Sequence, residues 1–116
     1  MSEEERSKKG RKKRDRIRAE WTPWLERFEQ ARERSKEMGG AEKVEQRMHA
    51  RGKLDVRQRV DALCDPGSFS EIGSLVGNKS DLPADGFVCG VGTVDGRPVL
   101  VGAEDYTIMG GASGPG

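Results

Sequence analysis

An Asp95-Gly96 pair between two apolar runs is the feature that most constrains the fold of this chain. In such a setting this dipeptide predicts a type I′ β-hairpin with a two-residue loop. The loop fixes the register, so we expect these residues to face each other: Val94 and Arg97, Gly92 and Val99, Val91 and Leu100, Gly90 and Val101, Cys89 and Gly102, Val88 and Ala103.

The two faces of this hairpin differ in character. One face sets glycines opposite valines, and a strand glycine leaves room for another layer to approach closely. The other face, with Val91 and Leu100, is more continuously apolar. We therefore expect both faces to be covered and the hairpin to belong to a larger sheet.

The apolar residues are too few and too unevenly placed for a large independent core. Of the 116 residues, 33% are hydrophobic and 35% are charged, and the hydrophobic ones concentrate after Leu54. A domain of the remaining size buries only about 60% of the surface of its unfolded chain. We expect the chain to need a partner or to be part of something longer.

Residues 1–20 are polar, and nine of the thirteen residues from Arg6 to Arg18 are Lys or Arg. We interpret residues 1–20 as a basic flexible tail. The alternative is an electrostatic contact with nucleic acid or an acidic partner. No aromatic residue interrupts the basic run, so nucleic acid is not the expected partner.

Residues 21–65 read as a helical segment. Thr22 as N-cap and Pro23 as first helical residue predict a helix start, and Gly39-Gly40 predicts its end. Between them, Trp24, Leu25, Phe28, Ala31, Ser35 and Met38 form an amphipathic stripe. The stripe either packs within the fold or docks on another surface.

Two shorter helices and a strand are expected next. One helix spans 41–50, with Val44 and Met48 one turn apart and Gly52 as its stop. The other spans 56–64, with Asp55 and Gln58 as a capping box and a buried edge of Val56, Val60 and Leu63. The turn of residues 65–68 leads into a strand over 69–72, residues 73–86 form a loop, and a strand continues over 105–109.

Few residues are suited to chemistry. His49 is the only histidine, so neither a metal site nor a Ser-His-Asp set is expected. Gly110 and Gly111 begin the run Gly-Gly-Ala-Ser-Gly, whose amides suit an anion or an oxyanion; the alternative is a flexible end. Cys64 and Cys89 read as reduced core residues of a cytoplasmic protein. No apolar run approaches a membrane span, so no membrane partner is expected.

A resemblance covers about residues 38–111. The motifs are Met38-Gly39-Gly40, Arg51-Gly52-Lys53-Leu54, Arg57-x-Arg59-Val60, Asp65-Pro66-Gly67-Ser68-Phe69-x-Glu71, Ala84-Asp85-Gly86, Gly92-Thr93-Val94-Asp95-Gly96-Arg97-Pro98-Val99, Asp105-Tyr106-Thr107 and Gly110-Gly111. In order and spacing they resemble the start of the carboxyltransferase β subunit of biotin-dependent acyl-CoA carboxylases, of the propionyl-CoA and methylcrotonoyl-CoA carboxylase type. The family more often has Gly-Gly-Ser, then an apolar residue and Gly, where this chain reads Gly-Gly-Ala-Ser-Gly.

The resemblance implies an α/β fold: N-terminal helices and a β-hairpin sheet, as the incomplete N-terminal part of a crotonase-like (ClpP/crotonase) carboxyltransferase domain beginning at residue 66. It implies transfer of a carboxyl group from carboxybiotin to an acyl-CoA. It also implies a biotin carboxylase and biotin carrier subunit as partners and a homo-hexamer. Catalytic oxyanion glycines are expected downstream of residue 116, so the chain is expected to be an inactive N-terminal fragment.

Arg51 and Lys53 are the side-chain candidates for binding CoA phosphates, with Gly110 and Gly111 as further substrate-binding candidates. The alternative for Arg51 and Lys53 is ion pairs with neighbouring carboxylates. The alternative for the whole chain is a non-catalytic protein that binds carboxylase subunits through the Trp24/Phe28 helix or the hairpin edge.

Overall fold

The computed structural model describes residues 1–78 and 82–112. It divides into two compact units, Met1–Gln30 and Ala31–Gly116, which are described separately. The part of the predicted glycine loop beyond Ala112 lies outside the described residues.

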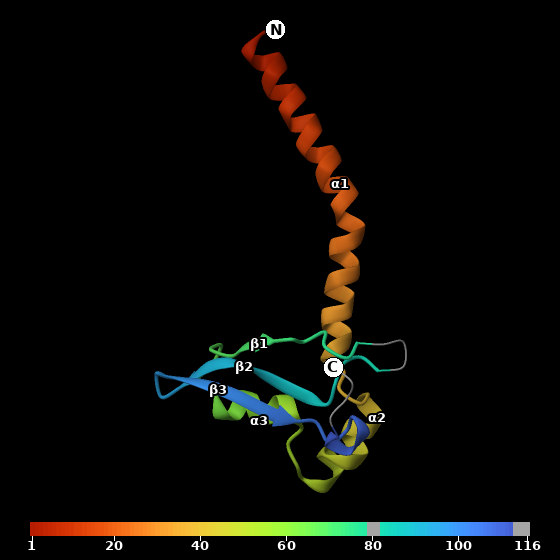
Figure 1. Cartoon of the computed structure of the whole chain (residues 1–116), viewed down its shortest axis with the longest axis vertical. Helices are drawn as coiled ribbons and strands as arrows, with labels where there is room; N and C mark the ends of the chain where they lie inside the picture. The colour runs from red at the N-terminus through yellow and green to blue at the C-terminus, as the bar shows by residue number, and fades with distance from the viewer. Residues whose placement is uncertain (79–81, 113–116) are drawn as a thin grey trace. The chain divides into compact units, whose positions relative to one another are not determined.

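Helix α1 spans Glu3–Ser35 (Figure 1), so the prediction of a helix start at Thr22 and Pro23 is wrong, and residues 3–20 belong to the same helix. The helix begins at a capping box instead: the Ser2 hydroxyl accepts from the Glu5 amide, and the Glu5 carboxylate accepts from the Ser2 amide. Lys, Arg and Glu are good helix formers and extend the helix through the basic run. Thr22 and Pro23 lie within α1, where the Thr22 hydroxyl donates to the Arg18 carbonyl.

The first unit leaves its apolar stripe uncovered. Trp21, Trp24, Leu25 and Phe28 are all about half exposed or more. The guanidinium of Arg27 lies 5.2 Å from the centre of the Trp24 ring.

The second unit contains the short helices much as expected. Helix α2 spans Ala41–Arg47 and a 3-10 turn, η1, spans His49–Arg51. Val44 and Met48 are buried, and Gly52 ends η1 in the left-handed region with φ 69°.

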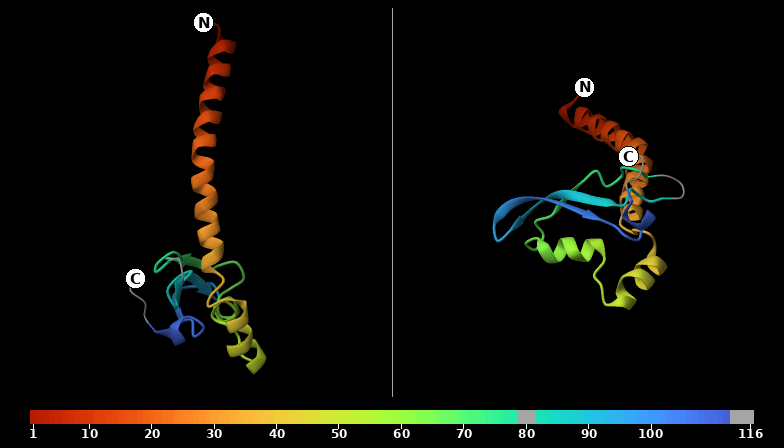
Figure 2. Two further views of the ribbon diagram at one scale, coloured as in Figure 1. Left: turned by 90° about the vertical axis from the view of Figure 1, so that its right-hand side faces the viewer. Right: turned by 60° about the horizontal axis from the view of Figure 1, so that its bottom comes forward.

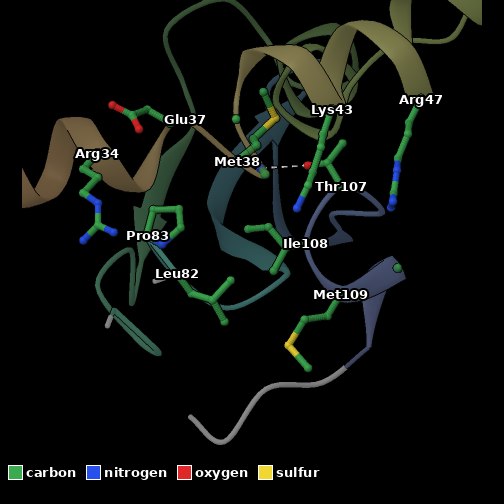
Figure 3. Close-up of a pocket in the computed structure, with 13 residues that line it drawn as sticks. Arg34, Glu37, Met38, Lys43, Arg47, Leu82, Pro83, Thr107, Ile108 and Met109 are labelled. Atoms are coloured by element: carbon green, nitrogen blue, oxygen red, sulfur yellow. Dashed lines mark hydrogen bonds between the residues drawn. The ribbon is translucent and has the colours of Figure 1, made fainter. Parts of the chain in front are cut away.

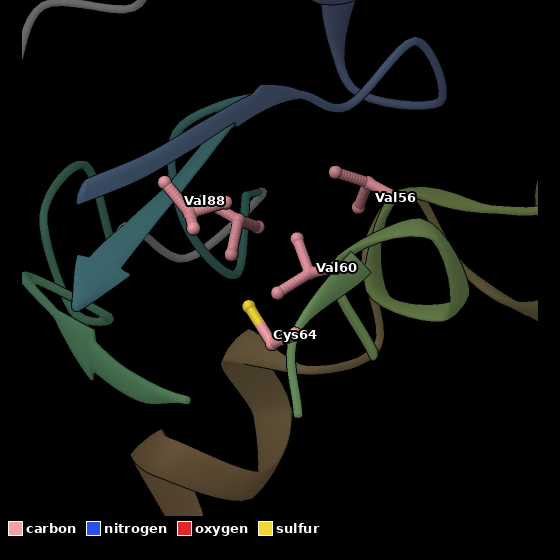
Figure 4. Close-up of a cluster of buried hydrophobic side chains, with 5 residues drawn as sticks. Val56, Val60, Cys64 and Val88 are labelled. Atoms are coloured by element: carbon pink, nitrogen blue, oxygen red, sulfur yellow. The ribbon is translucent and has the colours of Figure 1, made fainter. Parts of the chain in front are cut away.

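Helix α3 spans Val56–Leu63 and begins with the predicted capping box of Asp55 and Gln58. Val56 and Val60 are buried as expected, but the prediction that Leu63 is buried is wrong, since it is 55% exposed. The chain leaves the helix in an extended conformation at Cys64. Cys64 therefore takes the buried place beside Val60 and Val88 (Figure 4).

The sheet is antiparallel in the order β1-β2-β3, with β1 Ser70–Ile72, β2 Phe87–Val94 and β3 Arg97–Glu104. The predicted hairpin register between β2 and β3 is confirmed in every pair. Asp95 and Gly96 have φ values of 49° and 75°, as a type I′ loop requires.

The glycine face of the hairpin packs closely, as expected. Helix α3 lies against it (Figure 2), and a Cβ built on Gly92 would lie 3.2 Å from Cys64 Sγ. Within the described residues the opposite face is open, so its cover by a partner or by another part of a longer protein stays a prediction. There Leu100 is 86% exposed, and Ile72, Phe87 and Val91 are exposed as well.

Two carboxylates connect distant segments of this unit. Asp65 accepts hydrogen bonds from the Thr93 hydroxyl at 2.6 Å and from the Asp95 and Gly96 amides, both at 2.9 Å. The Thr93 bond and the two amide bonds lower the pKa of Asp65 despite partial burial. Glu71 binds Arg57 with both oxygens, at 2.8 and 3.2 Å. The Asp-Pro-Gly-Ser turn and α3 are thus both fastened to the sheet.

The predicted strand over 105–109 is wrong. After β3 the chain turns, and a short 3-10 segment, η2, spans Met109–Gly111. The buried carboxylate of Asp105 accepts from both the amide and the hydroxyl of Thr107. Such a local side-chain bond competes with a strand ladder and favours a turn.

Candidate functional site

Two neighbouring pockets bring together most of the residues that the sequence singled out. The first, here the Gly110 pocket, has a volume of about 510 Å³ (Figure 3). Its lining combines the cations Arg34, Lys43 and Arg47, the carboxylate of Glu37, and a mainly apolar remainder of Met38, Gly39, Gly40, Leu82, Pro83, Thr107, Ile108, Met109 and Gly110.

A hydrogen-bond relay holds one wall of the Gly110 pocket. The Gly39 amide donates to Thr107 Oγ1 at 2.9 Å, the dashed line in Figure 3. Thr107 Oγ1 in turn donates to Asp105 Oδ1 at 2.6 Å. Asp105 and Thr107 are only 3% and 2% exposed, so the relay is shielded from water. It joins the motif Met38-Gly39-Gly40 to the motif Asp105-Tyr106-Thr107, between which the sequence predicts no contact.

Cations from α2 extend over this wall. Lys43 and Arg47 lie one helical turn apart and reach toward the segment that contains Thr107 and Met109 (Figure 3). Because Met38 and Ile108 line the same pocket, it suits a ligand with both anionic and apolar parts.

The two candidate glycines are not equivalent. Gly110 and Gly111 both have positive φ, 65° and 81°, which glycine adopts without steric cost. The Gly111 amide donates to the Ile108 carbonyl at 2.8 Å. Within the described chain the Gly110 amide has no backbone hydrogen-bond partner, and Gly110 lines the pocket. Gly110 is therefore the better placed of the two to donate to a ligand.

The second pocket, here the Tyr106 pocket, has a volume of about 220 Å³. Arg51 and Lys53 come together here, beside Arg59 of α3 and the shared Arg47; the remaining lining residues are Met48, Val56, Glu104 and Tyr106. The Arg47 guanidinium lies 5.8 Å from the centre of the Tyr106 ring.

The alternative role of Arg51 and Lys53 was ion pairing with neighbouring carboxylates. Among the described residues neither of them, nor Arg59, has a carboxylate within 4.0 Å. By contrast, Arg57, which also projects from α3, is paired with Glu71. Arg47, Arg59 and Tyr106 were not among the site residues predicted from the sequence, where the basic residues that recur through 47–59 were the available signal.

His49 has a structural setting. Its Nε2 lies 2.9 Å from Asp55 Oδ2 and its Nδ1 lies 3.4 Å from Glu45 Oε2. The Asp55 hydrogen bond raises the pKa of His49 above its usual value. Within the described ranges, no group of three His, Cys, Asp or Glu side chains could hold a metal ion. No described helix has the length and apolarity to cross a membrane.

Comparison with known proteins gives matches over the same region. A family model described as the carboxyl transferase domain matches residues 47–116. The 12S subunit of methylmalonyl-CoA carboxyltransferase from Propionibacterium freudenreichii is 43% identical over 86 residues, which cover 67% of this chain and 16% of that protein. The propionyl-CoA carboxylase beta chain of Roseobacter denitrificans is 41% identical over 96 residues, covering 76% and 19%. The chain therefore spans less than a fifth of the length of these relatives.

Solved structures match as well. A hexameric transcarboxylase 12S structure with hydrolysed methylmalonyl-CoA bound gives a TM-score of 0.69 at 38% identity, over 76% of this chain and 19% of that one. The beta subunit of P. aeruginosa geranyl-CoA carboxylase gives 0.73 at 28% identity, over 87% and 19%. These neighbours confirm the expected fold class, helices followed by an antiparallel sheet as part of a crotonase-like carboxyltransferase domain.

Proposed function

Because this chain belongs to the carboxyl transferase domain family, we propose that it forms part of a subunit that transfers a carboxyl group from carboxybiotin to an acyl-CoA. The chain covers under a fifth of its relatives' length. We therefore assign carboxyl transfer to the whole of such a subunit. To this chain we assign a share of acyl-CoA binding.

The observation that carries this assignment is the meeting of Arg51 and Lys53 with Arg47 and Arg59 in one pocket of the family-matched region. Cations without carboxylate partners repel each other and attract polyanions. The phosphates of CoA supply that charge, and charge-assisted hydrogen bonds to phosphate are the stronger kind. In this proposal Arg51 and Lys53 bind CoA phosphates, and the Gly110 amide donates to the acyl-CoA beside them. Gly111 remains a substrate-binding candidate, although its amide already donates to the Ile108 carbonyl within the turn.

The proposed setting follows from the same family. Carboxybiotin would come from a biotin carboxylase and biotin carrier subunit, and the intact subunit would assemble as a homo-hexamer, as one matched structure does. The proposed compartment is the cytoplasm, since Cys64 and Cys89 are both free thiols. The chain alone is expected to transfer no carboxyl group.

The test is calorimetric titration of the 116-residue chain with CoA. Arg51→Ala combined with Lys53→Ala should weaken binding at least tenfold, because charged hydrogen bonds are lost. Arg97→Ala combined with Lys13→Ala is the matched control. It removes the same charge at exposed positions outside both pockets and should leave affinity nearly unchanged. Equal affinities of the two double variants would contradict the binding role.

A second candidate function rests on the exposed aromatic stripe of α1. Trp24 and Phe28 are 62% and 49% exposed, which suits a non-catalytic chain that docks on intact carboxylase subunits, and the hairpin edge is the other surface available for this. A pull-down with purified carboxylase subunits tests it. If the wild-type chain recovers carboxylase subunits and the double variant Trp24→Ala/Phe28→Ala does not, docking through the aromatic stripe is supported. If the wild-type chain recovers no subunit, the docking function is contradicted.

A further inference from the structure

We propose that the Tyr106 pocket recognises the 3′-phosphoadenosine end of CoA and so distinguishes CoA from its 3′-dephosphorylated form. This inference rests on the proposed function and deepens it. It names which end of the ligand enters which pocket.

The first argument is charge. Four cations line this pocket and Glu104 is its one carboxylate among the described residues. Arg51, Lys53 and Arg59 are solvent-exposed, so a ligand can reach them. A phosphate monoester carries about −1.5 to −2 charges at neutral pH and three acceptor oxygens. The 3′-phosphate is the monoester of CoA, and it therefore matches the most cationic corner best.

The second argument is the Tyr106 ring. Asp105 and Thr107 on either side are 3% and 2% exposed and hydrogen-bonded to each other, whereas Tyr106 is 54% exposed. A rigid turn thus presents an open aromatic ring beside the cations. Base–aromatic stacking is the usual role of such a ring in nucleotide binding, and Arg47 at 5.8 Å can add a cation–π contact.

The third argument is size. At about 220 Å³ the Tyr106 pocket is smaller than the roughly 300–1,000 Å³ of pockets that hold a whole drug-sized ligand. It can accept one end of CoA. The Gly110 pocket is larger, at about 510 Å³, contains Met38 and Ile108, and shares Arg47 with its neighbour. The pantetheine arm suits that pocket, with the diphosphate at Arg47 between the two.

The experiment compares CoA with 3′-dephospho-CoA, and adenosine 3′,5′-bisphosphate with adenosine 5′-monophosphate, by calorimetry on the whole chain. The ligands with the 3′-phosphate should bind at least tenfold more tightly. Arg59→Ala should weaken CoA at least fivefold and leave dephospho-CoA nearly unchanged. Tyr106→Ala should weaken all four ligands, while Tyr106→Phe should retain binding because the ring remains.

The outcomes separate this inference from the proposed function. If CoA binds but dephospho-CoA binds equally well, the inference fails and the CoA-binding role stands. If Arg59→Ala weakens both forms equally, the 3′-phosphate does not lie at Arg59 and the inference also fails. If wild-type chain with a cooperative melting transition binds no CoA, both proposals fail. Arg97→Ala serves as the charge-matched control throughout.

Discussion

The backbone amide of Gly39 donates a hydrogen bond of 2.9 Å to the hydroxyl of Thr107, although 68 positions separate the two residues. This bond joins the segment before α2 to the turn after β3. Both flanks of the Gly110 pocket depend on it, because Met38 and Ile108 lie beside the two bonded residues.

Gly39→Ala should destabilise the second unit by roughly 1–3 kcal/mol, the usual cost of overpacking. A Cβ at this position would lie 2.7 Å from the Thr107 carbonyl carbon. Urea denaturation followed by circular dichroism measures the loss. Gly10→Ala is the control, since nothing lies within 4 Å of its Cβ. Equal stability of both variants would contradict the close approach at Gly39.

Glu71→Gln should cost roughly 1–3 kcal/mol of unfolding free energy, between the values for exposed and fully buried ion pairs. The side chains of Arg57 and Glu71 are 23% and 19% exposed, and Arg57 Nε has no hydrogen-bond partner in the described structure. Chemical denaturation gives the value. The exposed pair of Lys36 and Glu33 provides the comparison, and Glu33→Gln should change stability little.

Asp65→Asn should make stability less dependent on acid pH. The pKa of Asp65 in the folded protein is lowered from 3.8. Its contribution is therefore complete above about pH 3.8 and is lost as the pH falls through the lower folded value. The difference in Tm between wild type and variant should be largest near neutrality and narrow below pH 4. A difference that stays constant down to about pH 2.5 would argue against the hydrogen bonds that the Asp65 carboxylate accepts from Thr93, Asp95 and Gly96.

His49 should titrate above 6.5 because Asp55 stabilises its protonated form. The raised pKa means that its stabilising contribution is complete below pH 6.5 and disappears as the pH rises through the folded value. As the only histidine, it gives isolated imidazole signals in an NMR titration. Asp55→Asn should move the midpoint back toward 6.5. An unshifted midpoint in the wild type would refute the contact.

Leu100→Thr and Val101→Thr should differ sharply, although the residues are adjacent. Leu100 is 86% exposed and Val101 is 8% exposed, because neighbouring strand residues point to opposite faces. The first change should stay within about 0.5 kcal/mol, and the second should cost about 1–3 kcal/mol for the buried hydroxyl. Chemical denaturation curves measure the unfolding free energy of each variant. A large loss for Leu100→Thr would mean that the outer face is covered in solution.

Local sequence patterns were reliable where neighbouring residues decide the structure. The Asp95-Gly96 loop fixed the register of β2 and β3. A two-residue turn places Val94 opposite Arg97, and every other pair along the two strands follows from that one. The Asp55 and Gln58 capping box lies within a single helical turn. The order and spacing of the family motifs also require only the sequence, because they do not depend on contacts in the fold.

Two local signals predicted the wrong outcome because other residues of the same helix decided it. Local signals at Thr22 and Pro23 suggested a helix start, yet α1 runs through them because the flanking residues favour helix and Ser2 caps it. Leu63 is exposed, whereas the expected core residue Cys64 is buried, because α3 ends at Leu63, one residue earlier than expected.

The sequence by itself determined the family, the hairpin register and the capping box of α3, because these depend on order, spacing and bonds a few residues long. Only the tertiary structure decided which sheet face is covered, which cations gather around Tyr106, and how Gly39 meets Thr107. Those relations arise when α2, η1 and α3 fold back on the end of β3. No local periodicity encodes the distance between segments that lie tens of residues apart in the chain.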